Sequence, residues 1–209
     1  MASLGARVLQ SRSVELAMTQ RVPLRVLSSF VEPGSAENVG TIVCDEEEIV
    51  EKRIVSGVAY SRDEAKISLF GLPDHPGVSS EIFGRLADAN VNVDMIVQSH
   101  ARQEGAANME FTVGKRDAAR TMELVNDAKA AIGFQDISID DNVAKVSVIG
   151  VGMRSHTGVA QTMFKALAEK GVNIQVISTS EIKISVLIDA AYTELAVRAL
   201  HAAYGLDQL

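Results

Sequence analysis

Residues 65–99 of the chain read AKISLFGLPDHPGVSSEIFGRLADANVNVDMIVQS. The stretch begins with apolar side chains at alternate positions, which is the pattern of a half-buried strand. A Pro/Gly turn, LPDHPG, follows, and apolar residues then recur at helical spacing from Val78 to Leu86. Two asparagines end the helical pattern before alternation resumes at Val93. The stretch therefore predicts a strand, a turn, a helix and a second strand, which together form a compact βαβ-type unit.

The same pattern occurs again at residues 144–180, which read AKVSVIGVGMRSHTGVAQTMFKALAEKGVNIQVISTS, with a turn that is two residues longer. Identical positions include Ala65-Lys66 with Ala144-Lys145, Gly71 with Gly150, Gly77-Val78 with Gly158-Val159, Phe83 with Phe164, Leu86-Ala87 with Leu167-Ala168, and Val91-Asn92 with Val172-Asn173. A repeat of this length predicts two copies of one domain, because a solenoid is built from three or more shorter units.

Strand counting predicts how the two copies are connected. The first continues through a strand at 108–113, a helix at 117–131 and a strand at 134–139, which completes the order βαββαβ. The second copy ends without a fourth strand. Because an unpaired sheet edge is normally covered, we predict that the strand at 54–60 fills the empty place. The first copy would then be inserted within the second domain.

Composition and charge limit the partners and the compartment. The formal net charge of −7 disfavours nucleic acid as a partner. No apolar run approaches the ~20 residues of a membrane-spanning helix, and the N-terminus lacks the apolar core of a secretory signal. The single cysteine, Cys44, excludes an internal disulfide and fits a reducing compartment. We therefore expect a cytoplasmic protein that binds neither nucleic acid nor membranes.

The βαββαβ unit with a Pro/Gly turn after its first strand resembles the ACT domain, a small-molecule sensor of amino-acid metabolism. The runs SHTGV at 155–159 and VNIQVISTSEIKISVLI at 172–188 resemble the regulatory region of aspartokinase. Residues 7–30, followed by Gly40-Thr41, resemble the end of the aspartokinase catalytic domain. The resemblance implies an α+β fold with two ferredoxin-like ACT domains, the first inserted in the second, preceded by a remnant of the amino-acid kinase domain.

The expected boundaries follow from the strand count and the resemblance. They are a kinase-domain remnant at 1–44, an acidic linker at 45–53, a first ACT domain at 64–141, and a second ACT domain at 54–63 plus 142–209.

The resemblance also implies a function. Aspartokinase converts ATP and L-aspartate to 4-phospho-L-aspartate, the first step towards lysine, threonine and methionine. Its regulatory region implies binding of threonine and/or lysine for feedback inhibition, a partner in the aspartokinase catalytic domain or α subunit, and a homodimer formed through ACT domains.

The sequence departs from the family at its front. It has neither the Lys-Phe-Gly-Gly motif of the amino-acid kinase domain nor a GxxxxGK[ST] phosphate loop. We expect no catalytic residues and no cofactor in this chain, since ATP and Mg²⁺ would bind the absent kinase domain. Three alternatives stay open: a regulatory subunit, part of a full-length aspartokinase, and a free-standing ACT sensor not tied to a kinase.

An amino-acid effector presents a carboxylate and an ammonium. The backbone N–H groups from Gly77 to Ser79, at a helix N-terminus, suit the carboxylate. Asp74 in the turn, or Asp94 on the second strand, suits the ammonium. Gln98, two strand periods beyond Asp94, is predicted on the same sheet face, where it can read a hydroxyl or an amide. Asp74 has an ordinary alternative role as a turn residue that bonds its own backbone.

The resemblance places effector-binding positions on both copies. They are Asp74, His75, Pro76, Gly77, Val78, Ser79, Asn92, Val93, Asp94 and Gln98 in the first, and Val159, Ala160, Asn173, Ile174 and Ser180 in the second. The asparagines could equally be helix terminators. The four histidines show no metal-ligand spacing, so we expect no metal site.

Overall fold

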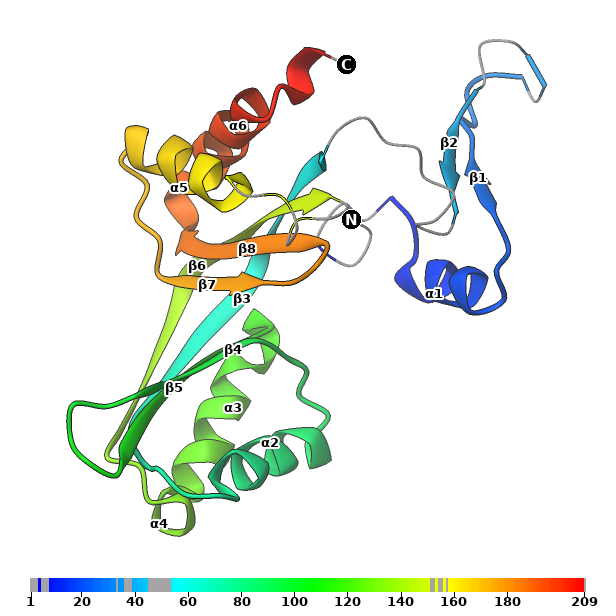
Figure 1. The fold of residues 1–209 in the computed structure, drawn as a ribbon. Helices are drawn as coiled ribbons and strands as arrows, with labels where there is room; N and C mark the ends of the chain where they lie inside the picture. The colour runs from blue at the N-terminus through cyan, green and yellow to red at the C-terminus, as the bar shows by residue number, and fades with distance from the viewer. Residues whose placement is uncertain are drawn as a thin grey trace.

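The computed structural model describes residues 4, 8–32, 34–35, 39–44, 54–150, 153, 156 and 158–208. An N-terminal segment contains α1 (Ser11–Thr19) and a small antiparallel sheet of β1 (Leu24–Val26) and β2 (Thr41–Val43). Figure 1 shows this segment beside a larger α+β body. The predicted linker at 45–53 lies outside the described residues.

The larger body is built on one antiparallel sheet with the strand order β4-β5-β3-β6-β8-β7. Its strands are β3 (Val55–Pro73), β4 (Val93–His100), β5 (Ala106–Val113), β6 (Asp136–Gly150), β7 (Val176–Thr179) and β8 (Lys183–Asp189). Its helices are α2 (Val78–Asp88), α3 (Lys115–Asp127), α4 (Lys129–Ile132), α5 (Val159–Glu169) and α6 (Thr193–Ala203), with 3₁₀ turns η3 (Ala190–Tyr192) and η4 (Leu206–Gln208). The predicted α+β class is confirmed.

β3 and β6 are long strands that both repeats share. The first part of β3 pairs with the last part of β6, where Ala59 lies opposite Ser147. Further along, Ile67 of β3 lies opposite Ile139 of β6. The strand at 54–60 therefore completes the sheet of the second repeat, as strand counting predicted. The sequence predicted four separate strands here, two along β3 and two along β6, but each pair is one continuous strand. Register shifts between Ser61 and Lys66 let β3 pass from the second repeat to the first without a turn.

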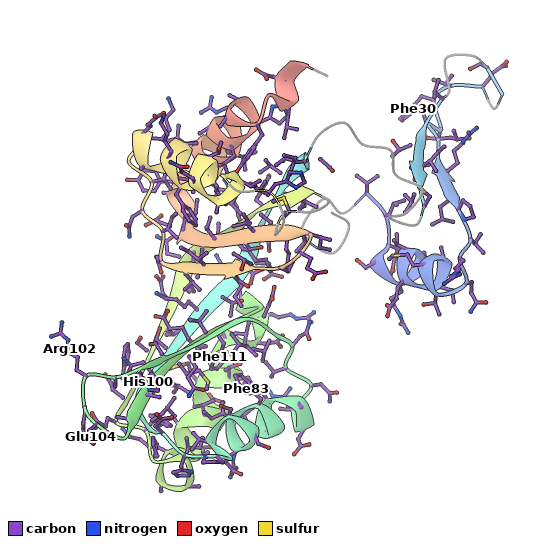
Figure 2. The ribbon with its side chains drawn as sticks, in the orientation of Figure 1. Phe30, Phe83, His100, Arg102, Glu104 and Phe111 are labelled. Carbon is purple, nitrogen blue, oxygen red and sulfur yellow. The ribbon has the colours of Figure 1, made fainter. Side chains whose placement is uncertain are left out.

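Each repeat has a core between its helices and one part of the sheet. In the first, Phe83 of α2 packs edge-to-face on Phe111 of β5, with ring centroids 5.4 Å apart (Figure 2). In the second, Met163 and Leu167 of α5 pack on Val186 of β8. Each repeat therefore has a hydrophobic core of its own. Burying one such side chain stabilises the fold by about 1.5–3 kcal/mol.

A third, smaller cluster joins the two repeats. Met95 of β4 packs with Val143 of β6, Val176 of β7 and Leu187 of β8, and all four side chains are buried. The cluster brings β4 of the first repeat against β7 of the second, although the two strands form opposite edges of the sheet (Figure 1). This contact places the candidate site of the first repeat next to the second repeat.

Candidate functional site

The turn between β3 and α2 forms an open helix N-terminus. Gly77 is the N-cap of α2, with φ +104°, a left-handed conformation that favours glycine. No side chain caps this end, and a Cβ built on Gly77 would meet nothing within 4 Å. Because the first N–H groups of a helix have no intrahelical partner, this end can receive an anion such as a carboxylate.

The end of β4 lies beside this turn. The Ser79 hydroxyl donates a hydrogen bond to Oε1 of Gln98 at 3.3 Å. Asp74 Oδ2 lies 3.2 Å from Nδ1 of His100, a residue that the sequence analysis did not select (Figure 2 labels it). Asp74, Ser79, Gln98 and His100 are called the turn cluster below. It combines a carboxylate, an amide and a helix N-terminus, which is the complement of a small zwitterion.

The remaining residues of the predicted turn site differ in their surroundings. His75 and Pro76 are exposed, and Nδ1 of His75 lies 3.1 Å from the Pro76 carbonyl oxygen. Val78 is buried in the first core, so its side chain supports α2 and only its backbone faces outward. Asn92 is exposed, whereas Val93 pairs with Val113 and packs against the first core.

Asp94 does not share a sheet face with Gln98, so that prediction is wrong. Asp94 lies opposite Thr112 and Val97 lies opposite Glu110, but Gln98 lies opposite Met109, a core residue on the helix side. The register shift between Asp94 and Val97 is a β-bulge, in which one extra residue reverses the alternation. Gln98 consequently faces α2, and Asp94 faces the second repeat.

Asp94 belongs to a charged cluster at the junction of the repeats. Lys145 Nζ lies 2.8 Å from Asp94 Oδ2 and 2.6 Å from Glu64 Oε1. The side chains of Lys145 and Glu64 are 7% and 8% exposed, against 47% for Asp94. Two carboxylates and one ammonium leave this cluster with a formal charge of −1. Breaking such a buried pair is costly, so the cluster fixes the position of β4 against β6.

Both partners of the ion pair are held in their charged forms. Burial alone would raise the pKa of Asp94, but hydrogen bonds from Lys145 and from the Met95 N–H outweigh it and lower that pKa. Burial alone would lower the pKa of Lys145, but its hydrogen bonds to Asp94 and Glu64 raise that pKa above its ordinary value. The ion pair therefore persists across the neutral pH range.

Met95, directly after Asp94, adopts φ +47°. A left-handed backbone at a residue other than glycine costs roughly 1–3 kcal/mol and persists only where its surroundings enforce it. Here the Met95 N–H donates to Asp94 Oδ1 at 2.8 Å, and the Met95 side chain is buried in the cluster between the repeats. The bulge is thus held by contacts with the second repeat.

The second repeat has a similar frame with different polar groups. Gly158 caps α5 with φ +96°, and Val159 is buried in the second core, with Ala160 and Ile174 packed at its margin. The Tyr204 hydroxyl donates to the Val159 carbonyl oxygen at 2.7 Å, and burial raises the pKa of Tyr204 to about 12. Much of the preceding turn lies outside the described residues.

The repeat equivalents of Ser79, Gln98 and Asp94 are Ala160, Thr179 and Gln175. Asn173 is exposed, and the Ser180 N–H donates to the Lys183 carbonyl oxygen at 2.8 Å in the turn between β7 and β8. The structure therefore assembles a polar cluster at the first repeat, and the Ser79–Gln98 bond has no equivalent in the second, because Ala160 has no hydroxyl group.

Among the described residues, no group of three or more His, Cys, Asp or Glu side chains could hold a metal ion. None of the helices in that part of the chain has the length and apolar character needed to cross a bilayer.

Comparison with known proteins gives the family. The ACT domain family matches the chain twice, over residues 67–130 and 146–204. The aspartokinase of Pseudomonas aeruginosa is 52% identical over 209 residues, an alignment that covers 99% of this chain and 49% of the relative. The chain thus spans about half the length of the curated relatives it matches.

Two solved structures are matched over nearly the whole of their own chains. A crystal structure of aspartokinase alpha and beta subunits contains a chain that is 50% identical, with a TM-score of 0.68 over 72% of this chain and 99% of that chain. The ligand-free regulatory subunit of aspartate kinase from Thermus thermophilus is 41% identical, with a TM-score of 0.69 over 73% of this chain and 99% of that chain. The chain therefore belongs to the aspartokinase family and contains its regulatory part, built from two ACT domains.

Proposed function

We propose that this chain senses threonine and/or lysine at the turn cluster of its first ACT domain and thereby restrains an aspartate kinase. The whole protein would convert ATP and L-aspartate to 4-phospho-L-aspartate, with ATP and Mg²⁺ bound outside this chain. The observation that carries the proposal is the contact between Ser79 and Gln98, which brings β4 to an uncapped helix N-terminus beside Asp74.

The turn cluster offers a partner for each group of an amino acid. The backbone N–H groups at the start of α2 receive the α-carboxylate, which the helix dipole also favours. Asp74 is favoured over Asp94 for the ammonium, because both oxygens of Asp94 already accept hydrogen bonds from Lys145 and Met95. Gln98 then hydrogen-bonds the side chain of the bound amino acid, since its amide group can both donate and accept.

The N-terminal segment supports a kinase partner. Several of its apolar side chains are exposed, among them Leu16 (62%), Ile42 (56%) and Phe30 (98%), which Figure 2 shows at the edge of the segment. Such a surface is typical of one that packs against another body. The regulatory subunit from Thermus thermophilus matches about three quarters of this chain. We propose that residues 1–44 belong with the amino-acid kinase domain and dock onto its remainder or onto an α subunit.

The edge strands of the sheet support a homodimer formed through ACT domains. β4 and β7 are the two edge strands, and each carries a half-exposed isoleucine at equivalent positions, Ile96 and Ile177. An exposed apolar edge strand readily pairs with another strand, so a second copy of the chain is the expected partner. Restraint of the kinase would then follow from an effector that favours one arrangement of the paired domains.

Isothermal titration of the purified chain with threonine and, separately, lysine tests the proposal. Wild-type protein is expected to bind at least one of them, and Gln98→Ala is expected to weaken that binding by about threefold to tenfold, the value of one hydrogen bond. The matched control is Thr179→Ala, the same position in the second repeat, which should leave the affinity unchanged.

No heat with either amino acid would contradict the sensing role. Equal losses in the two variants would contradict the assignment to the first repeat. Binding by a chain that associates with no aspartokinase catalytic chain would favour a free-standing ACT sensor instead.

A further inference from the structure

We infer that Lys145, from the second ACT domain, positions Gln98 of the first, by holding the bulge in β4 that turns Gln98 towards α2. The role of Gln98 as an effector ligand rests on the proposed function. The role of Lys145 in orienting Gln98 rests on geometry alone.

The bulge decides which face Gln98 occupies. Met95 and Ile96 together lie opposite the single residue Phe111 of β5, between the pairs formed by Asp94 and Val97. In a regular strand, residues four apart point to the same side, so Gln98 would point away from α2 together with Asp94. With the extra residue, Gln98 points to the helix side and its Oε1 accepts the hydrogen bond from Ser79.

The bulge is held from the second domain. Oδ1 of Asp94 accepts a hydrogen bond from the Met95 N–H, in the backbone of the bulge. Oδ2 of Asp94 accepts one from Lys145 Nζ at 2.8 Å. Lys145 is itself fixed by Glu64 at 2.6 Å and is almost fully buried. The Met95 side chain packs on Val143, two residues before Lys145 on β6.

The second repeat supplies an internal comparison. Gln175, which directly precedes β7, stands where β4 has Asp94, and its N–H donates to the Leu187 carbonyl oxygen at 2.8 Å. The four residues of β7 itself pair with β8 in an unbroken register. Gln175 instead donates from Nε2 to Asp140 Oδ2 at 3.4 Å. At this position the first copy therefore has an aspartate held by a lysine of the other domain, and the second copy has a glutamine bonded to Asp140.

This arrangement links effector binding to the contact between the domains. The effector site of the first domain is complete only when Lys145 of the second domain holds Asp94. Because binding and conformation are linked, an effector that binds the form in which Gln98 points to α2 must also favour the Lys145–Asp94 contact. Lys145 is thus a positioning residue whose effect on affinity passes through Gln98.

The first experiment needs no effector. In ¹⁵N NMR spectra of the full chain, Lys145→Met should shift the Gln98 side-chain amide signals in the same direction as Ser79→Ala does, because both remove the contact. The matched control is Lys66→Met, the equivalent lysine of the first repeat, which should leave those signals in place. Unmoved Gln98 signals in folded Lys145→Met protein would overturn the inference.

The second experiment is a double-mutant cycle in effector affinity, measured by titration calorimetry with threonine and with lysine. Lys145→Met and Gln98→Ala should each weaken binding by about threefold to tenfold, and the double variant should be no weaker than Gln98→Ala alone. Additive losses would mean that Lys145 supports only general stability, which would overturn the inference.

If Lys145→Met does not fold, Lys145→Met combined with Glu64→Gln takes its place in both experiments, with the same expected results. This double variant also removes the buried charge of Glu64, so that only the half-exposed Asp94 is left without its cation. A wild-type chain that binds neither amino acid would defeat the proposed function, while the NMR experiment would still decide the role of Lys145.

Discussion

The Ser79 hydroxyl lies 3.3 Å from Oε1 of Gln98, so the first turn of α2 is tied directly to the edge strand β4. The equivalent positions in the second ACT domain are Ala160 and Thr179, and alanine has no group that could form this bond. The two copies of one fold therefore differ at the place where an amino acid would be recognised. This difference is the reason we propose the sensing role for the first copy.

Ser79→Ala should weaken effector binding without unfolding the chain. The hydrogen bond to Gln98 is exposed, so its loss should change the free energy of unfolding by less than about 1 kcal/mol. Urea unfolding measures stability, and titration calorimetry measures affinity. A large loss of stability would mean that the pair is structural and would contradict its role in recognition.

The glycine that caps α2 and the glycine inside it should respond in opposite directions to alanine. Gly77 has a left-handed φ of +104° with open space around it, so Gly77→Ala should cost about 1–2 kcal/mol from backbone strain alone. Gly84 lies inside α2, and its added Cβ also meets nothing within 4 Å, so Gly84→Ala should stabilise by about 0.5–1 kcal/mol. Urea unfolding of the two variants checks the signs. Equal effects would contradict the left-handed cap.

Gly150→Ala should be among the more damaging single changes in the sheet. A Cβ at Gly150 would collide with the carbonyl oxygen of Ile54, where β3 begins to pair with β6. We expect a loss of about 2–4 kcal/mol, as for other substitutions that force backbone apart. Gly114→Ala is the control, since its Cβ would meet only Asp117 at 3.7 Å, and it should lose no more than about 1 kcal/mol. A fully stable Gly150→Ala protein would contradict the pairing of residues 55–61 with the second domain.

Acid should remove the contribution of Asp94 to stability. Its folded pKa lies below the ordinary 3.8, so this contribution is present above that pH and is lost as pH falls through the lower folded value. Lys145, whose folded pKa lies above 10.5, loses its contribution only as pH rises beyond that value.

Wild-type protein should therefore be more stable than Asp94→Asn near neutral pH, and the difference should shrink in acid. Urea unfolding at about pH 6 and about pH 3 measures it. A difference that is the same at both pH values would show that Asp94 does not stabilise the fold as an ionised group.

Much of the fold is predictable from the repeat. The matching residues at 65–99 and 144–180 predict two βαββαβ units, and the strand missing from the second predicts the place of residues 54–60. These features are local patterns, or counts of them. The fusion of neighbouring strands into β3 and β6 was not predicted, because polar residues such as Asp63 and Asp141 are as common in turns as in bulged strands.

The candidate site is predictable only in part. The turn, Ser79 and Gln98 follow from the sequence, but the relation between Asp94 and Gln98 does not. Alternation places them on one face, and the bulge at Met95 overrides it. The bulge depends on Lys145, which lies 51 residues from Asp94 along the chain, and no local pattern carries that contact.

Hydrogen exchange of the full chain, with and without saturating threonine or lysine, tests the sensing site most directly. Bound effector should slow exchange at the start of α2 and along β4, and should leave the start of α5 and β7 less affected, since the polar pair is found in the first copy. Protection confined to the second ACT domain, or binding without protection at residues 77–82, would contradict the account.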